Sequence, residues 1–212
     1  MTNRGRLFVI SGPAGVGKSE IVKILLKKHQ DIALSVSCTT RAPRPGEVNG
    51  VSYHFVSDER FDELVAQDAF YEWARVHQNR YGTLKSVVQQ LLDDGHDLIL
   101  EIDVQGCLQA MAQDETVTGI FICPPSRENL EKRLRNRGTE TEESIRVRLN
   151  NVARECATAY QYDYIIIHQD WSVKPNALED AAEEVYDIIT AERRKLERNR
   201  AFLDQLNASL KA

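Results

Sequence analysis

The sequence predicts an α/β fold, a parallel sheet flanked by helices. Short apolar segments typical of buried strands recur along the 212-residue chain, at residues 7–10, 98–103, 119–122 and 163–167. Between them lie longer segments whose apolar residues follow helical spacing, such as residues 84–92. Strands that alternate with helices in this way are typical of a parallel sheet with helices on both faces.

The first strand leads into a glycine-rich turn and then a helix. Residues 12–19, GPAGVGKS, fit the phosphate-loop pattern G-x-x-x-x-G-K-[ST] without a gap. The glycines allow positive φ and bring backbone N–H groups close to an anion, while Lys18 adds a charge and the Ser19 hydroxyl is placed to bind Mg²⁺. We therefore expect a nucleoside triphosphate here, rather than a turn that binds nothing. The residues expected to bind it are Gly12, Pro13, Ala14, Gly15, Val16, Gly17, Lys18 and Ser19.

The next part of the chain breaks the alternation of strands and helices. Residues 32–37 alternate with period two and predict a half-buried strand. The expected elements after it are a loop at 38–49, a strand at 53–56, a helix capped by Ser57, a strand at 70–76 and a turn at 81–83. Two or three short strands and one helix indicate a small inserted subdomain between Ser37 and about Tyr81.

The second half of the chain returns to the α/β pattern. The apolar run 98–103 contains Glu101 and Asp103 at its end, which places carboxylates where parallel sheets gather ligands. The other expected elements are a helix at 84–92 ended by Gly95, a short helix after Gly106, a strand at 119–122, a helix from Ser126 to Leu134, a helix opened by Thr139 and Glu142, a strand at 163–167 and one unbroken helix from about Pro175 onward.

Composition indicates a soluble cytoplasmic enzyme. The net charge of −5 argues against a general nucleic-acid binder. The longest apolar runs are too short to span a membrane, and the N-terminus lacks a signal-peptide core. The four cysteines form no C-x-x-C pair, so free thiols are expected and a zinc site is not.

Four further segments carry a resemblance to a known family. Residues 39–55 read TTRAPRPGEVNGVSYHF, and EWA, YGT and RGTETEESI follow at 72–74, 81–83 and 137–145. Together with the phosphate loop, these motifs resemble guanylate kinases from about Leu7 to Ile167. The resemblance implies transfer of the ATP γ-phosphate to GMP, giving ADP and GDP in purine nucleotide metabolism, with dGMP as a further acceptor. It also implies a phosphate-loop NTPase core, a small α+β GMP-binding subdomain and a helical lid.

The resemblance implies a GMP site with two parts. Arg41, Arg44, Tyr53 and Tyr81 match the residues that hold the GMP phosphate, and guanidinium groups and phenols suit phosphate oxygens. Ser37 and Glu72 match the residues that recognise guanine, because a carboxylate accepts from N1–H and N2–H₂ together whereas adenine presents an acceptor at N1. Thr83 stands where the family usually has serine, and Asp103 matches a residue near guanine and the reaction centre.

On the donor side the resemblance implies catalytic roles for Lys18 and for the lid arginines Arg133, Arg137 and Arg148. The implied cofactor is Mg²⁺, held by Ser19 and, through water, by Glu101 or Asp103, a choice that the sequence leaves open. The implied division of the chain is core at 1–36 and 84–125, GMP-binding subdomain at 37–83, lid at 126–153, and core with C-terminal helix at 154–212.

Three questions remain open at this level. The family has Asn where this chain has His168, so either an adenine contact or a simple strand-end histidine is compatible with the sequence. Two other functions stay as alternatives: an inactive, scaffold-type relative, and a kinase for another phosphorylated acceptor such as a ribose phosphate. The apolar residues Phe202, Leu203, Leu206 and Leu210 indicate either a solvated terminal helix or a contact between copies in a homo-oligomer.

Overall fold

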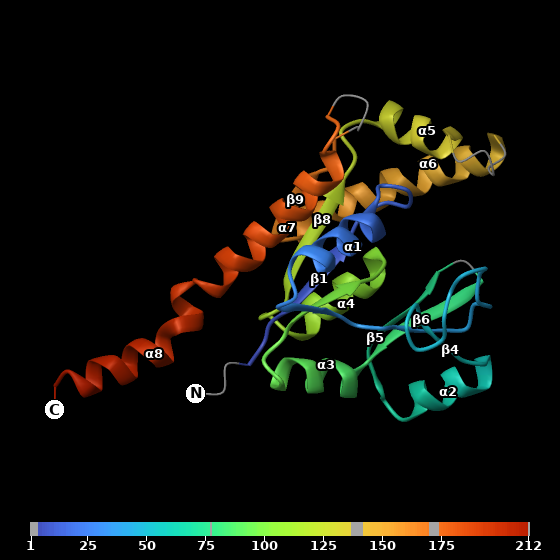
Figure 1. The fold of residues 1–212 in the computed structure, drawn as a ribbon. Coiled ribbons are helices and arrows are strands. Elements are labelled where there is room, and N and C mark those ends of the chain that lie inside the picture. The colour runs from blue at the N-terminus through green and yellow to red at the C-terminus, as the bar shows by residue number, and fades with distance from the viewer. Residues whose placement is uncertain (1–3, 77, 137–141, 170–173, 212) are drawn as a thin grey trace.

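The computed structural model describes residues 4–76, 78–136, 142–169 and 174–211, apart from the side chains of Arg133, Asn136, Ser144 and Arg148. Its main sheet has five parallel strands in the order β2-β7-β1-β8-β9 (Figure 1). These strands are β1 (Leu7–Ser11), β2 (Ile32–Leu34), β7 (Asp97–Glu101), β8 (Thr118–Cys123) and β9 (Tyr164–Ile167). The predicted fold class, a parallel sheet flanked by helices, is confirmed.

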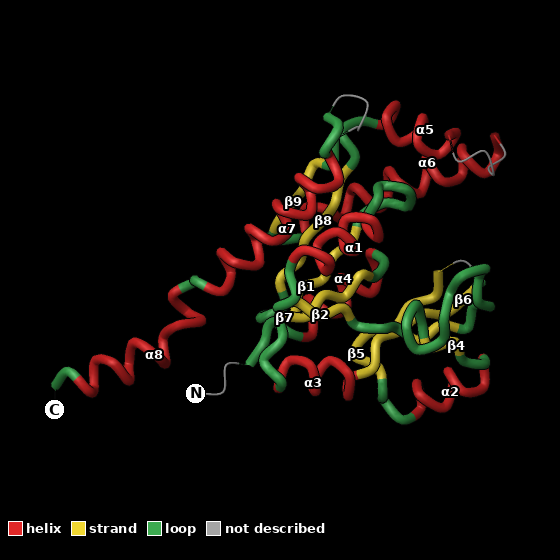
Figure 2. Tube along the Cα trace, in the orientation of Figure 1, coloured by secondary structure: helices red, strands yellow, loops and turns green. Residues whose placement is uncertain are grey.

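The central strand β1 is buried on both faces because alternate side chains of a strand point to opposite sides. Phe8 and Ile10 pack against α1 (Lys18–Lys28) and α7 (Ala177–Arg193). Leu7 and Val9 pack on the other face, against α3 (Lys85–Asp93) and α4 (Val104–Gln113). Figure 2 shows these helices around the strands. The sheet therefore fixes the position of the loop that follows β1.

A second sheet forms a separate projection, in the order β4-β3-β6-β5 (Figure 1). Its strands are β3 (Cys38–Thr39), β4 (His54–Phe55), β5 (Phe70–Val76) and β6 (Asn79–Leu84). Helix α2 (Asp58–Ala66) covers this sheet through Phe61 and Leu64, and its expected Ser57 cap is confirmed by a 3.2 Å bond from the Arg60 N–H.

Two expectations for this region are wrong. Tyr81, Gly82 and Thr83 lie in β6, paired with β5, and not in a turn. The chain reverses just before Asn79, without the glycine or proline that usually indicates such a reversal. The expected strand 32–37 also ends early, at Leu34, because the chain leaves the main sheet there and starts β3 at Cys38.

The helices near the carboxyl ends of β7 and β8 differ in detail from the expectation. Helix α4 begins at Val104, so Gly106 lies inside it and does not precede it. Helices α5 (Arg127–Asn136) and α6 (Glu142–Ala157) pack on one another and project on the same side of the molecule as the second sheet (Figure 1). The Ser126 hydroxyl accepts from the Asn129 N–H at 3.1 Å, as expected of a cap, whereas Thr139 lies outside the described residues.

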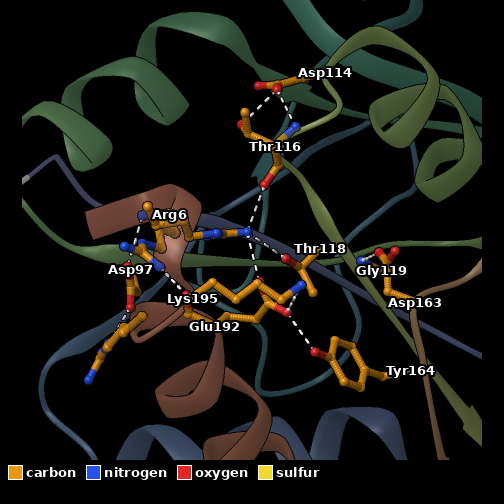
Figure 3. Close-up of polar contacts among 12 residues, drawn as sticks. Arg6, Asp97, Asp114, Thr116, Thr118, Gly119, Asp163, Tyr164, Glu192 and Lys195 are labelled. Atoms are coloured by element: carbon orange, nitrogen blue, oxygen red, sulfur yellow. Dashed lines mark hydrogen bonds and ion pairs between the residues drawn. The ribbon is translucent and has the colours of Figure 1, made fainter. Parts of the chain in front are cut away.

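The expected single C-terminal helix is two helices, α7 and α8 (Leu196–Ser209). The chain leaves helical geometry at Lys195, whose ψ is 136°. Next to this break, the buried Glu192 carboxylate accepts from the Tyr164 hydroxyl at 2.6 Å and lies 2.6 Å from Lys195 Nζ and 2.9 Å from an Arg198 nitrogen. Figure 3 shows Glu192 between Tyr164 and Lys195. The bond to Tyr164 comes from a distant strand, and the break occurs in a local pattern that contains neither glycine nor proline.

Beyond Arg198, α8 extends away from the body of the molecule (Figure 1). Leu196, Phe202, Leu203, Leu206 and Leu210 are exposed and form what we call the α8 stripe. None of the helices formed by the described residues is both long and apolar enough to cross a membrane.

We predict that Glu192→Ala lowers the free energy of unfolding by about 2 kcal/mol, because charge-assisted hydrogen bonds to a buried carboxylate are lost. Urea denaturation followed by circular dichroism measures this. Asp204→Ala, at an exposed position on α8, is the control and should change the free energy by less than about 0.5 kcal/mol. Equal midpoints for wild type and Glu192→Ala would contradict the role of this carboxylate.

Candidate active site

The loop between β1 and α1 has the backbone geometry that its glycines allow. Gly12 and Gly17 have φ of 147° and 102°, in the region that disfavours other residues. A side chain on Gly12 would also collide with the carbonyl of Ile122 on β8. The Lys18 ammonium donates to the Gly12 carbonyl at 2.5 Å and to that of Pro13 at 3.3 Å. The loop therefore curls around its own lysine at the carboxyl end of the central strand.

Carboxylates from β7 and its vicinity surround this lysine. The pairing of β7 with β1 places Glu101 beside the loop. There the Glu101 carboxylate accepts from the Ser19 hydroxyl at 2.5 Å. Asp103 caps α4 by accepting from the Gly106 N–H at 2.9 Å. Burial lowers the pKa of Lys18, and the charges of Glu101, Glu155 and Asp103 act in the opposite direction. The site thus holds a positive charge among acids at one edge of the sheet.

A buried carboxylate faces this edge from the second sheet. Glu72 on β5 is 4 % exposed and accepts from the Thr83 hydroxyl on β6 at 2.6 Å. The Thr83 and Ser37 hydroxyls lie 3.3 Å apart. Burial raises the pKa of Glu72 to about 7; the Thr83 bond opposes this rise and the nearby Asp103 adds to it. Glu72 is therefore poised to change protonation near neutral pH.

Two tyrosines and an arginine lie together at one corner of the second sheet. The Tyr53 and Tyr81 rings meet edge to face, with centroids 5.9 Å apart. Arg41 lies over the Tyr53 ring at 5.4 Å and forms a two-pronged pair with Glu47 at 3.0 and 2.8 Å. The Arg44 side chain is exposed in the same loop. This corner of the second sheet combines fixed cationic and phenolic groups, which are donors that suit phosphate.

A single cavity of about 270 Å³ connects the loop to the second sheet. Among its lining residues, Gly12, Ala14 and Lys18 come from the loop region, and Ser37, Tyr53, Glu72 and Tyr81 come from the second sheet and the segment leading into it. Glu101 and Asp103 lie between these two groups on the cavity wall. The structure thus brings together residues that lie up to 143 positions apart in the chain, from Gly12 to Glu155.

Some predicted site residues lie elsewhere. Among the described residues, Arg41 and Arg44 do not line the cavity. Ser19 and Thr83 do not line it either, but their hydroxyls donate to the lining carboxylates of Glu101 and Glu72. Arg137 lies outside the described residues. Arg133 and Arg148 lie in α5 and α6, but the structure does not describe their side chains, so their catalytic roles stay predictions.

Comparison with known proteins gives a consistent result. The family model described as guanylate kinase matches residues 4–192. The chain belongs to the guanylate kinase family. It is 45 % identical over 196 residues to the guanylate kinase of Clostridium perfringens strain SM101, covering 92 % of this chain and 88 % of that protein. It is 40 % identical over 208 residues to that of Thermotoga maritima, covering 98 % and 97 %.

A solved structure agrees with the sequence relatives. The crystal structure of guanylate kinase from Anaplasma phagocytophilum matches with a TM-score of 0.72 and 34 % identity, covering 92 % of this chain and 90 % of that chain. The suspected resemblance to guanylate kinases is therefore confirmed, and so is the fold expected from it.

The residues of this guanylate kinase family member fit the Mg²⁺ that its family implies. No three His, Cys, Asp or Glu side chains gather as a metal cluster within the part of the chain that the structure describes. Mg²⁺ does not need one, because it is commonly held by one or two carboxylates, water and substrate phosphates. The Ser19 hydroxyl and the Glu101 carboxylate already lie together beside the loop, and both are oxygen ligands.

Glu155 is a cavity residue that the sequence did not indicate. It lies in the last turn of α6, lines the cavity and acts electrostatically on Lys18. Its neighbours in the sequence form an ordinary amphipathic helix. From the sequence alone, Glu155 therefore cannot be told from a glutamate on the solvent-exposed face of that helix. Only the way α6 meets the main sheet brings it to the lysine.

We predict that ionisation of Glu72 destabilises the ligand-free protein. A folded-state pKa near 7 exceeds the ordinary value, so the folded state binds more protons between about pH 4.5 and 7 and loses stability as pH rises through that range. Glu72→Gln removes this dependence. Relative to wild type, the variant should therefore gain about 2 kcal/mol in free energy of unfolding between pH 5 and pH 8.

The measurement is urea denaturation at the two pH values. Glu115→Gln, at an exposed position, is the matched control and should follow wild type at both. A constant difference between Glu72→Gln and wild type would show that the carboxyl group titrates normally.

Proposed function

We propose that this protein transfers the γ-phosphate of ATP to GMP, giving ADP and GDP, and that dGMP is a second acceptor. The proposal assigns it to purine nucleotide metabolism in the cytoplasm. The observation that carries it is the single cavity with Lys18 at one end and Glu72 at the other, in a chain that belongs to the guanylate kinase family. A donor triphosphate at the loop and an acceptor at Glu72 would meet across Glu101 and Asp103.

Glu72 is the proposed guanine-recognising group. Its ionised carboxylate accepts from guanine N1–H and N2–H₂, while Ser37 lies beside it to serve O6. Thr83 supports this role by occupying one carboxylate oxygen and so fixing the orientation of the other. Asp103 contributes from the core side of the cavity. The GMP phosphate is held by Arg41, Arg44, Tyr53 and Tyr81. The rings of Tyr53 and Tyr81 already lie edge to face, so their hydroxyls come from neighbouring side chains.

The chemistry needs alignment and charge neutralisation more than proton transfer. A nucleoside monophosphate has a second pKa of about 6 and is already a nucleophile near neutral pH. Lys18 and the loop N–H groups hold the donor phosphates in line, and Arg133, Arg137 and Arg148 neutralise charge from the lid. Ser19 and, through water, Glu101 would hold Mg²⁺, which would supply further neutralisation of the donor phosphates' charge. Asp103 is the weaker candidate for this role because one of its oxygens caps α4.

The proposed division of the chain follows these roles. Residues 37–83 form the GMP-binding subdomain and residues 126–153 the lid, on a core of 1–36, 84–125 and 154–212. The lid and subdomain project on the same side of the sheet, which supports closure over a shared site that excludes water (Figure 1).

An assay of ADP release with Mg-ATP and a panel of acceptors tests the function. GMP and dGMP should both be phosphorylated. AMP, CMP, UMP and ribose 5-phosphate should give little turnover, because none of them offers Glu72 the paired N1–H and N2–H₂ donors of guanine. Absence of turnover with GMP, in protein shown to be folded, would favour the inactive scaffold-type alternative. Preference for ribose 5-phosphate would favour the other kinase.

We predict that Glu72→Gln lowers kcat/KM for GMP about 100-fold, because an amide presents a donor to the donors of guanine and leaves buried groups unpaired. Discrimination between GMP and AMP should fall by a similar factor. Steady-state kinetics with both acceptors measures this, with Glu115→Gln as the control. A variant that keeps the wild-type preference would show that Glu72 does not recognise the base.

We also propose that a second copy of the chain covers the α8 stripe. Isolated helices of about 14 residues are marginal in water, and α8 has no buried residue of its own. Leu196, Leu203 and Leu210 recur every seven residues with Leu206 between them, which is the spacing of a coiled-coil seam. A two-fold axis would bring the α8 stripes of two copies together.

Sedimentation tests this contact. We predict that the double substitution Leu203→Glu and Leu206→Glu reduces the mass from dimer to monomer, because it places charges in the seam. The matched control is Ala201→Glu and Ala208→Glu, on the opposite face of the same helix, which should leave the mass unchanged. A wild-type chain that sediments as a monomer at micromolar concentration would end this proposal.

A further inference from the structure

His168 lies against the phosphate loop. It follows β9, is 1 % exposed, and its backbone N–H donates to the Cys123 carbonyl on β8 at 2.9 Å. Its ring nitrogen Nδ1 lies 2.6 Å from the carbonyl oxygen of Val16, in the loop. Since a carbonyl oxygen only accepts hydrogen bonds, Nδ1 carries the proton and donates. The sheet therefore places a rigid donor behind the loop.

The ring is also in contact with the next residue of the loop. A Cβ atom built on Gly17 would lie 3.0 Å from His168 Cε1 and 3.2 Å from Nδ1. Gly17 has φ of 102° and immediately precedes α1. The backbone thus favours glycine here, and a side chain would also require the histidine ring to shift by a few tenths of an ångström, so the ring packs closely on the loop.

The bond from His168 fixes one peptide plane of the loop. A trans peptide group holds its C=O and N–H on opposite sides. When the Val16 carbonyl points at His168, the N–H of Gly17 must point away from the ring. Backbone N–H groups of such a loop are the ones that bind phosphate oxygens.

We propose that His168 is a positioning residue for the donor nucleotide: it orients the Val16–Gly17 peptide for phosphate binding and does not read the base. The inference rests on the proposed function, because it assumes that the loop binds the donor. The inference concerns the triphosphate alone, because the proposed GMP-binding residues line another part of the cavity. An effect of this histidine should therefore be confined to the donor.

Three substitutions test the inference. His168→Leu removes the donor and should raise KM for ATP about tenfold, with KM for GMP unchanged within twofold. His168→Asn places an amide N–H near the position of Nδ1 and should restore KM for ATP to within about threefold of wild type. His168→Gln carries its amide one bond further and should behave like His168→Leu. Thermal melts followed by circular dichroism show that each variant is folded.

A probe without a base separates positioning from base recognition. Calorimetry should give weaker binding of Mg²⁺-tripolyphosphate to His168→Leu by the same factor as for ATP, and ATP and GTP should be weakened equally. A wild-type KM for ATP in His168→Leu, or a changed ratio of ATP to GTP with unchanged tripolyphosphate binding, would overturn the inference. Failure of wild type to phosphorylate GMP is a separate result, which contradicts the proposed function and leaves the tripolyphosphate comparison able to test His168.

Discussion

The site depends on a positive charge held at the carboxyl end of the central strand. Lys18 is enclosed by loop carbonyls and faced by Glu101, Glu155 and Asp103. This arrangement requires the parallel sheet, because β7 must lie beside β1 to bring Glu101 to the loop. It also requires Gly12, whose backbone passes close to β8. The buried sheet is thus the scaffold that sets the geometry of the loop.

The second sheet adds a group of opposite character. Glu72 is a carboxylate with a raised pKa, held by Thr83 and close to α4, since a side chain on Gly106 would collide with it. The Trp73 N–H also donates to Gln109 of α4, at 3.4 Å. The site therefore lies where the second sheet meets the core, and α4 fixes the end of the cavity that contains Glu72.

Sequence motifs predicted the parts of the site that are local in the chain. The loop and the acids at the end of β7 follow patterns that need no knowledge of the fold, and the resemblance to guanylate kinases indicated the two tyrosines. Contacts between distant segments account for what the sequence missed. Tyr81 and Thr83 belong to a hairpin whose reversal has no glycine or proline, and the break before α8 lies beside the bond from Tyr164 to Glu192. The sequence did not indicate Glu155, and it named His168 without predicting its contact with the loop.

The central claim is that Glu72 recognises guanine through two hydrogen bonds. Calorimetric binding of GMP and IMP to the wild-type protein tests it most directly, because IMP keeps the N1–H and lacks only the exocyclic amino group. The account predicts that GMP binds at least about tenfold more tightly than IMP, since one bond to a buried carboxylate is lost. Equal affinities for the two nucleotides would contradict the account.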